Sequence, residues 1–338
     1  MMKIAVDAMG GDYAPDVVVI GAIEAAKSYD IEILLVGKEK LVSEMLLKYK
    51  WSDSEKIKIV NAEEVITMSD APTISVRKKK NSSISVGINL LKNKEADAFV
   101  SAGNTGAVVC AATLFLGLLK GIERPGIAIA FPTLNGVSML IDAGANIDPK
   151  PAHLLQYGIM AEAYYENVLG LKKNPSVGLL NVGEEATKGT EFIKETHDLL
   201  SKAPFNFIGN VEGKDIFSGK CDVIVCDGYV GNVALKVTES VAEMVHDLLK
   251  RRILQGILGK LGVLLLVKNL KKLKKDLDYA EYGGAPLLGV NGVVIIGHGR
   301  SSSTAIKNAI RVAKTEVERR INERIVNSIQ SIQQLAVA

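Results

Sequence analysis

Short apolar runs rich in β-branched residues recur along the chain, and most of them end in Gly, Asp, Asn or Ser. Longer stretches with apolar residues three or four positions apart, typical of helices, separate several of these runs. Strands that are apolar at nearly every position need cover on both faces, so the alternation predicts βα units around a mostly parallel sheet. The predicted strands are Lys3–Asp7, Ile31–Gly37, Ala98–Gly103, Ile127–Phe131, Val137–Asp142, Val177–Gly183, Val223–Gly228 and Val293–Gly297.

Two later segments have clear helical spacing, and each is expected to face either the core or a second copy of the chain. The first carries Val237, Val241, Met244, Val245 and Leu248, and the second carries Ile306, Ile310, Ala313, Val317, Ile321 and Ile325. No fixed-period repeat and no low-complexity linker divides the chain. We therefore expect a Rossmann-like αβα sandwich that forms a single α/β domain over residues 1–338.

The segment Lys250–Lys275 departs from this pattern, because nine Lys or Arg residues and no acid alternate there with apolar residues. Its longest apolar run, Val263–Val267, is far shorter than the roughly 20 residues that span a bilayer. The pattern predicts a protruding amphipathic helical hairpin over residues 250–277. The hairpin either lies on a membrane surface or packs on a partner subunit.

Charge, the N-terminal sequence and the cysteine content exclude some classes of function and localisation. With 41 basic and 38 acidic residues, the formal net charge of +3 gives no bulk attraction to nucleic acid, and no nucleic-acid partner is expected. The N-terminus lacks the apolar core of a signal peptide, which predicts a cytoplasmic protein. Three cysteines cannot all pair, and we expect reduced, mostly buried thiols.

Familiar catalytic motifs are absent from the sequence. The chain has no GxGxxG, no GxxxxGK[ST], no GxSxG and no HExxH, and its four histidines are scattered without metal-ligand spacing. We therefore expect no cofactor and no metal.

Gly-rich polar turns at predicted strand ends are the strongest chemical feature. Backbone N–H groups and the positive end of a helix dipole converge where a strand turns into a helix, which favours phosphate or carboxylate. Alternatively, the glycines only permit tight turns, and Asp and Asn cap the helices. The turns are Asp7–Asp12, Ser101–Gly106, Asn181–Glu184 and Asp227–Asn232.

Sequence segments over nearly the whole chain resemble those of the PlsX family, in the same order. They are Val6–Asp12, Arg77–Ser83, Ser101–Gly106, Gly178–Gly183, Asn206–Glu212, Gly231–Lys236 and Tyr282–Ala285. One departure is Tyr13, where the family pattern has His; its hydroxyl still offers a hydrogen-bond donor.

The resemblance implies reversible transfer of a long-chain fatty acyl group from acyl carrier protein to inorganic phosphate. The acyl phosphate would pass to a membrane glycerol-3-phosphate acyltransferase for phospholipid synthesis. Family resemblance also implies a homodimer, and the basic, apolar segment Lys250–Lys275 predicts that it associates peripherally with the inner face of the cell membrane. Because phosphate is the nucleophile, the enzyme needs no Ser or Cys nucleophile, in agreement with the missing motifs.

The resemblance also implies roles for individual residues. Lys188 and Asn232 are the expected catalytic residues, although Lys188 is alternatively a surface lysine and Asn232 a helix N-cap. The expected phosphate-binding residues are Gly10, Gly11, Asn104, Thr105, Asn181, Gly183 and Lys236. The expected membrane contacts are Leu258, Leu261, Leu264, Leu265, Lys271 and Lys272.

Two basic stretches, Arg77–Lys80 and the run after Lys250, are both candidate landing sites for the acidic acyl carrier protein. Two other functions stay open at this point. One is a phosphotransacetylase-like enzyme that uses an acyl-coenzyme A donor, and the other is a non-catalytic membrane scaffold for lipid-synthesis enzymes.

Overall fold

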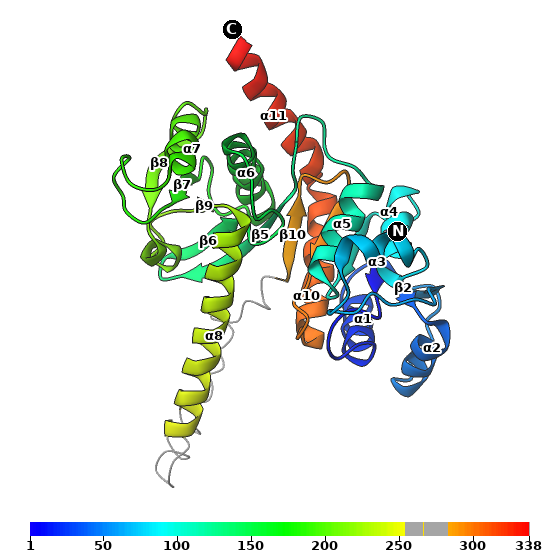
Figure 1. Cartoon of the computed structure of the whole chain (residues 1–338). Helices are drawn as coiled ribbons and strands as arrows, with labels where there is room; N and C mark the ends of the chain where they lie inside the picture. Colours follow the sequence, from blue (N-terminus) through cyan, green and yellow to red (C-terminus); the bar gives the residue numbers. More distant parts are fainter. Residues whose placement is uncertain (254–265, 267–282, 338) are drawn as a thin grey trace.

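The computed structural model describes residues 1–253, 266 and 283–337. An eleven-stranded sheet in the order β3-β2-β1-β4-β11-β10-β5-β6-β9-β7-β8 crosses the molecule, with helices on both faces (Figure 1). This arrangement confirms the predicted αβα fold. The strands are β1 Met2–Asp7, β2 Ile31–Gly37, β3 Ile57–Asn61, β4 Ala98–Ser101, β5 Gly126–Thr133, β6 Gly136–Ile141, β7 Ser176–Leu180, β8 Asn206–Val211, β9 Val223–Val225, β10 Ala285–Leu288 and β11 Val293–Ile296.

Helices connect most of these strands, and several begin at a polar capping residue. The side chains of Ser82, Asn104, Thr190 and Ser302 each accept a hydrogen bond from a backbone N–H of the first turn. The helices are α1 Asp16–Ser28, α2 Glu39–Lys48, α3 Pro72–Lys78, α4 Ser83–Lys92, α5 Thr105–Phe115, α6 Pro151–Tyr164, η1 Tyr165–Leu169, α7 Glu191–Ser201, η2 Gly213–Phe217, α8 Gly228–Ile253, α10 Ser303–Glu318 and α11 Ile321–Val337.

Strand direction divides the sheet into two halves. Strands β1, β2, β3, β4 and β11 run parallel to one another, and so do β6, β7, β8 and β9. Antiparallel pairs of β10 with β11 and β5, and of β5 with β6, join the halves. All eight predicted strands are present, and the sequence reasoning missed β3, β8 and β10.

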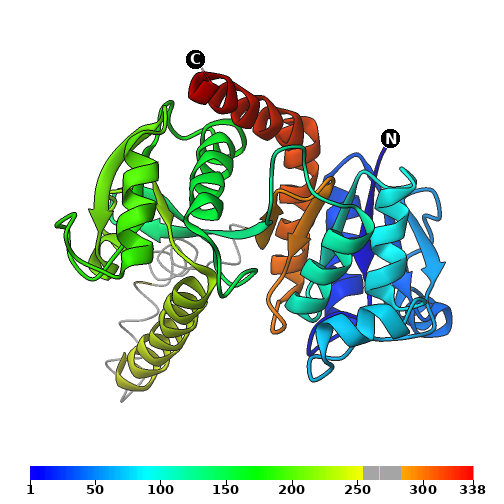
Figure 2. The ribbon, with the colours of Figure 1, turned by 45° about the horizontal axis from the view of Figure 1, so that its top comes forward.

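Each half of the sheet is covered on both faces, which explains its nearly continuous apolar strands. In β2, Ile33 and Leu35 pack into the core layer that contains α1 and α10, whereas Leu34 and Val36 pack with α4 and α5. In the second half, α6 and α7 cover one face, and η2 with the first turns of α8 covers the other (Figure 2).

The two predicted amphipathic helices behave differently. In the C-terminal one, Ile306, Ile310 and Ile325 are at most 2% exposed, so it faces the core, although it breaks into α10 and α11 at Arg320, where φ is 51°. In α8, by contrast, the five predicted apolar positions are 43% to 57% exposed, and the core-facing alternative is wrong for this helix. Its C-terminal half protrudes from the body (Figure 1).

The departure from the body therefore begins within α8, before residue 250. All six residues predicted to contact a membrane fall outside the described residues, so the hairpin over 250–277 stays a prediction. The assignment of residues 1–338 to a single domain also stays a prediction. No helix among the described residues is long and apolar enough to cross a bilayer.

One buried hydrogen bond joins the two halves of the molecule away from the sheet. Tyr164 Oη on α6 donates to Glu316 Oε1 on α10 at 2.9 Å. Glu316 is only 2% exposed, and its burial raises its pKa to about 8. Most copies of this side chain therefore carry a proton at neutral pH.

The three cysteines are free thiols, as predicted. Cys221 and Cys226 flank β9 and are buried, and burial raises the pKa of Cys221 to about 12. Neither has the thiolate character that a nucleophile needs.

Candidate functional site

Turns after β1, β4 and β11 touch one another at the carboxyl ends of these strands. A Cβ on Gly10 would lie 2.6 Å from the backbone N of Gly103, and Gly11 has a φ of +103°. The backbone N of Asp12 donates to the carbonyl of Gly299 at 2.7 Å. Glycine is required at Gly10 and Gly11 because the turns approach so closely and because φ is positive at the second of them.

The Asp7 carboxylate accepts hydrogen bonds from the turns after β1 and β4 and so stabilises both. Its Oδ1 accepts from the backbone N of Met9 at 3.0 Å, and its Oδ2 accepts from Ser101 Oγ at 2.7 Å. Ser101 Oγ in turn accepts from the backbone N of Gly103 at 3.1 Å. Burial raises the pKa of Asp7, which is 1% exposed. Asp7 therefore shapes the turns and does not face solvent.

The third turn, over residues 297–302, was missed by the sequence reasoning. The strand before it is predicted. His298 itself gives no local signal, because the four histidines lack metal-ligand spacing. Its sequence, Gly297-His298-Gly299, has the same character as the four selected turns and follows a strand in the same way. A Gly-rich polar turn directly after a predicted strand is the sequence signal that identifies it.

Helix α8 places Lys236 beside this turn through a shared carboxylate. Lys236 Nζ donates to Glu239 Oε2 at 2.8 Å, and His298 Nε2 lies 3.4 Å from Glu239 Oε1. Burial opposes ionisation of Glu239, but hydrogen bonds from His298 and Lys236 hold its pKa below the usual value. Glu239 thus keeps two nitrogen donors close together at the end of the first sheet half.

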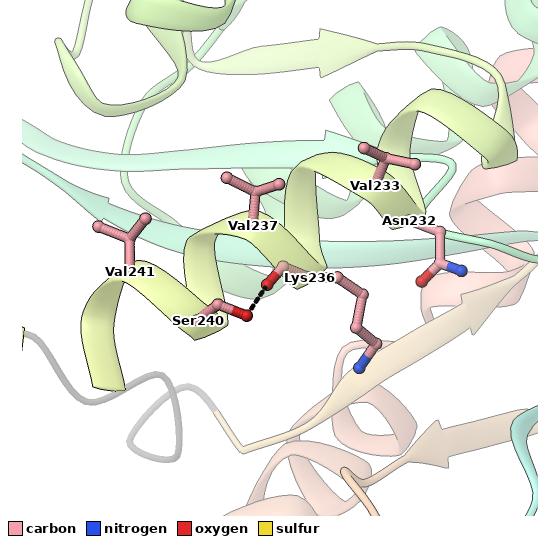
Figure 3. Close-up of a pocket in the computed structure, with 6 residues that line it drawn as sticks. All are labelled: Asn232, Val233, Lys236, Val237, Ser240 and Val241. Carbon is pink, nitrogen blue, oxygen red and sulfur yellow. Dashed lines mark hydrogen bonds between the residues drawn. The ribbon is translucent and has the colours of Figure 1, made fainter. Parts of the chain in front are cut away.

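Asn232 lies on the same side of α8 as Lys236, one turn earlier (Figure 3). The helix begins at Gly228, and Asp227 Oδ1 accepts from the backbone N of Val230 at 2.9 Å. Asp227 is therefore the cap, and the N-cap alternative for Asn232 is wrong. A Cβ on Gly144, in the turn after β6, would lie 3.4 Å from Asn232 Cβ, so this side chain stands at the junction of α8 and that turn.

Lys188 lies in the loop that follows β7, with Asn181 and Gly183. Asn181 Nδ2 donates to the carbonyl of Lys188 at 3.1 Å, and a Cβ on Gly183 would lie 3.2 Å from Lys188 Cγ. Strand β7 pairs with β9, which leads into α8, so Lys188 and Asn232 follow neighbouring parallel strands. The Lys188 side chain is exposed, and its catalytic role stays a prediction.

The Asn104 side chain is committed to the fold. Its Nδ2 lies within 3.3 Å of the carbonyls of Thr67, Met68 and Asp70, and its Oδ1 accepts from the backbone N of Ala107 at 3.0 Å. The helix-capping alternative therefore holds for Asn104. Thr105, which is exposed, is left as the side-chain donor of this turn.

Comparisons with known proteins identify the family. A family model described as fatty acid synthesis protein matches residues 2–324. The chain belongs to this family, PlsX. PlsX relatives named phosphate acyltransferase include one from Alkaliphilus oremlandii, 50% identical over 98% of both chains, and one from Halothermothrix orenii, 52% identical over 95% of this chain and 96% of the relative.

Solved structures support the PlsX fold at low sequence identity. A phosphotransacetylase from Streptococcus pyogenes superposes with a TM-score of 0.63 at 18% identity, covering 94% of both chains. A branched-chain phosphotransacylase from Enterococcus faecalis V583 has a TM-score of 0.55 at 14% identity, covering 94% of this chain and 100% of the other. At such identities the likeness concerns the fold alone.

Membership of the PlsX family makes the chain an acyltransferase, with phosphate and an acyl donor as substrates. The alternative of a non-catalytic scaffold is thereby overturned.

Proposed function

We propose that this enzyme reversibly transfers a long-chain fatty acyl group from acyl carrier protein to inorganic phosphate, and that the acyl phosphate feeds phospholipid synthesis. The observation that carries the proposal is the pair of Lys236 and His298, held by Glu239 beside Gly-rich turns. A phosphate bound there would meet the Lys236 ammonium and the imidazole of His298, which are donors of the kind that phosphate requires.

The chemistry needs no protein nucleophile. A phosphate oxygen attacks the thioester carbonyl carbon, the carbon–sulfur bond breaks, and the phosphate proton ends on the released thiol. The second proton of phosphate leaves at about pH 6 to 7, so a dianion is available near neutrality. The protein's task is to hold the dianion against its desolvation cost and to stabilise the oxyanion that develops on the thioester.

We assign the two substrates to different residues of the site. The turns with Gly10, Gly11 and Thr105 bind phosphate together with Lys236. Lys188 and Asn232, which follow the neighbouring strands β7 and β9, donate to the thioester oxygen. In this scheme Asn181 and Gly183 shape the loop that carries Lys188.

Acyl carrier protein is strongly acidic, so its binding needs a basic surface. Arg77, Lys78 and Lys80 at the end of α3 are exposed, whereas Lys79 pairs with Asp70 at 2.6 Å. A second basic group, Lys250–Arg252, ends α8 and is also exposed. Both surfaces remain candidates for docking the donor.

Donor competition tests the choice of carrier. With equimolar palmitoyl-acyl carrier protein and palmitoyl-coenzyme A at fixed phosphate, we expect kcat/KM to favour the protein donor at least tenfold at low salt. The preference should shrink as salt screens the basic surface. Equal or better use of the coenzyme A donor would support the phosphotransacetylase-like alternative instead.

We also propose a cytoplasmic homodimer that associates with the inner face of the cell membrane and hands its product to a glycerol-3-phosphate acyltransferase there. The support is the sequence of the basic, apolar segment after α8. Each Lys or Arg near an anionic surface contributes about 1 kcal/mol of binding, and apolar side chains add to it. Direct delivery would protect a reactive, apolar product from hydrolysis.

Flotation with phosphatidylglycerol vesicles tests this membrane contact. Wild type should float, and Leu264→Asp/Leu265→Asp should lose most of its vesicle-bound fraction because two charges oppose insertion. Leu134→Asp/Leu171→Asp is the matched control, since both leucines are exposed on the body. Equal recovery of all three proteins would count against membrane contact through this segment.

A further inference from the structure

The loop over residues 184–189 carries Lys188 and has no buried side chain, because each of its residues is exposed. Two asparagine amides hold backbone carbonyls of this loop. Asn181 Nδ2 donates to the carbonyl of Lys188 at 3.1 Å, and Asn210 Nδ2 donates to the carbonyl of Glu185 at 3.0 Å. Asn181 is close to the loop in sequence, whereas Asn210 belongs to strand β8, which lies beside β7 (Figure 1). The second attachment of the loop is therefore tertiary.

Asn210 is buried, and one of its two polar atoms is committed to this loop. The residue is 5% exposed, and its Oδ1 has no hydrogen-bond partner among the residues that the structure describes. An unsatisfied buried oxygen lowers stability, and an apolar side chain would avoid that loss. What the amide adds to the fold is thus the hydrogen bond to Glu185, whose carbonyl also accepts from the backbone N of Lys188 at 3.1 Å.

A bulge in β8 sets the direction of this side chain. The register of β8 against β7 shifts by one residue between Phe207 and Asn210. Gly209 lies within the bulge and has a φ of +90°, which favours glycine. Phe207 and Val211 consequently pack on opposite faces of the sheet, although a regular strand would place residues four apart on the same face. The bulge reverses the facing of Asn210 in the same way.

We propose that Asn210 is a positioning residue for the reaction: it fixes the loop at Glu185 and so holds the Lys188 ammonium at the thioester oxygen. The inference rests on the proposed function, which assigns Lys188 to that oxygen. A donor speeds the reaction most when it is in place before the charge develops, and an exposed loop without an apolar anchor does not provide this by itself. Because Asn210 is buried, it acts through Lys188 and not by contact with a substrate.

Asn210→Ala is the variant that removes this hydrogen bond. The carbonyl of Glu185 keeps the backbone N of Lys188 as a donor, so the variant leaves no unpaired group in the loop and should fold. Asn206→Ala is the matched control, because Asn206 is an exposed asparagine at the start of the same strand. Asn210→Ser, whose hydroxyl is too short to reach Glu185, serves if the alanine variant fails to fold.

The first measurement tests the position of the loop without any turnover. Trypsin can cut the chain after Lys188, and the rate of cutting follows the population of the opened loop. One hydrogen bond changes such a population about two- to twelvefold. Asn210→Ala should therefore be cut after Lys188 about threefold faster, or more, than wild type and Asn206→Ala. Cutting after Lys173, in an exposed loop before β7, should not change.

The second measurement asks whether the effect on turnover passes through Lys188. Thiol release from palmitoyl-acyl carrier protein gives kcat and the phosphate KM for wild type, the two single variants at Asn210 and Lys188, and the double variant. Asn210→Ala should lower kcat about fivefold and leave the phosphate KM within about twofold, since phosphate is assigned to turns of the other sheet half. In Lys188→Ala the same change should lower kcat less than about twofold, because the group that it positions is gone.

Three results would overturn the inference. Unchanged cutting after Lys188 in Asn210→Ala would mean that the loop does not depend on this amide. A kcat equal to that of Asn206→Ala would mean that Lys188 needs no such positioning. Equal losses of kcat with and without Lys188 would mean that Asn210 supports the fold in general. Failure of the proposed function is a separate result: wild type would release no thiol, which overturns the catalytic part of the inference, while faster cutting after Lys188 would still show that Asn210 holds the loop.

Discussion

Replacing Lys188 by alanine is expected to lower phosphate-dependent thiol release from palmitoyl-acyl carrier protein by 100-fold or more. The loss corresponds to about 2.7 kcal/mol of transition-state stabilisation. The physical reason is the charge that develops on the thioester oxygen, which an ammonium group at the end of β7 would stabilise. Since the loop is held by Asn181 and not by the lysine side chain, the variant should keep its fold.

Lys202→Ala is the matched control for this prediction. Lys202 is also exposed and follows the C-terminal end of α7, so it lies toward the amino ends of the strands, away from the loop after β7. Its replacement should leave the rate within twofold of wild type. If Lys188→Ala is as fast as Lys202→Ala, Lys188 is a surface lysine, as its exposure allows, and the oxyanion donors have to be sought around Asn232 and Lys236.

The second large effect concerns stability at alkaline pH. The pKa of Glu316 is about 8 in the folded protein, because of burial, and near 4.5 when the chain unfolds. A raised folded-state pKa contributes stability that is fully present below pH 4.5 and is lost as the pH rises to 8. Over this range the loss is on the order of 5 kcal/mol. Wild type should therefore lose stability relative to a variant that cannot ionise at this position.

Glu316→Gln is that variant, because it stays neutral and its Oε1 can still accept from Tyr164 Oη. Urea unfolding should give similar free energies for both proteins at pH 5 and a higher value for Glu316→Gln at pH 9, by several kcal/mol. Glu318→Gln, at a half-exposed carboxylate on the same helix, should follow wild type at both pH values. Parallel wild-type and Glu316→Gln curves from pH 5 to 9 would contradict the raised pKa.

The sequence predicted the fold well where strands are buried on both faces. The two strands at the edges of the sheet, β3 and β8, escaped prediction because their apolar runs are interrupted, in β3 by the exposed Lys58 and in β8 by Gly209 and the buried Asn210. Strand β10 was missed because its sequence, Ala-Pro-Leu-Leu, contains a proline and no β-branched residue. The break between α10 and α11 occurs at Arg320, without the Gly or Pro that usually marks the end of a helix.

The structure agrees with features of the candidate site that are local in sequence, whereas the binding and catalytic roles of these residues stay predictions. Gly10 and Gly11 are where a close approach of turns requires glycine, and Lys236 follows Asn232 by one turn on the same side of α8. What the sequence could not supply is tertiary pairing. The contact of His298 with Glu239 forms only in the folded chain, and so does the hydrogen bond from the Asn104 amide to the turn before α3.

The most direct test of the central claim is to incubate wild-type enzyme with palmitoyl-acyl carrier protein and follow free thiol and acyl phosphate together, with and without inorganic phosphate. We predict that thiol appears only when phosphate is present and in equal amount to acyl phosphate. Thiol release that is independent of phosphate, or no release at all from this donor, would contradict the proposed function.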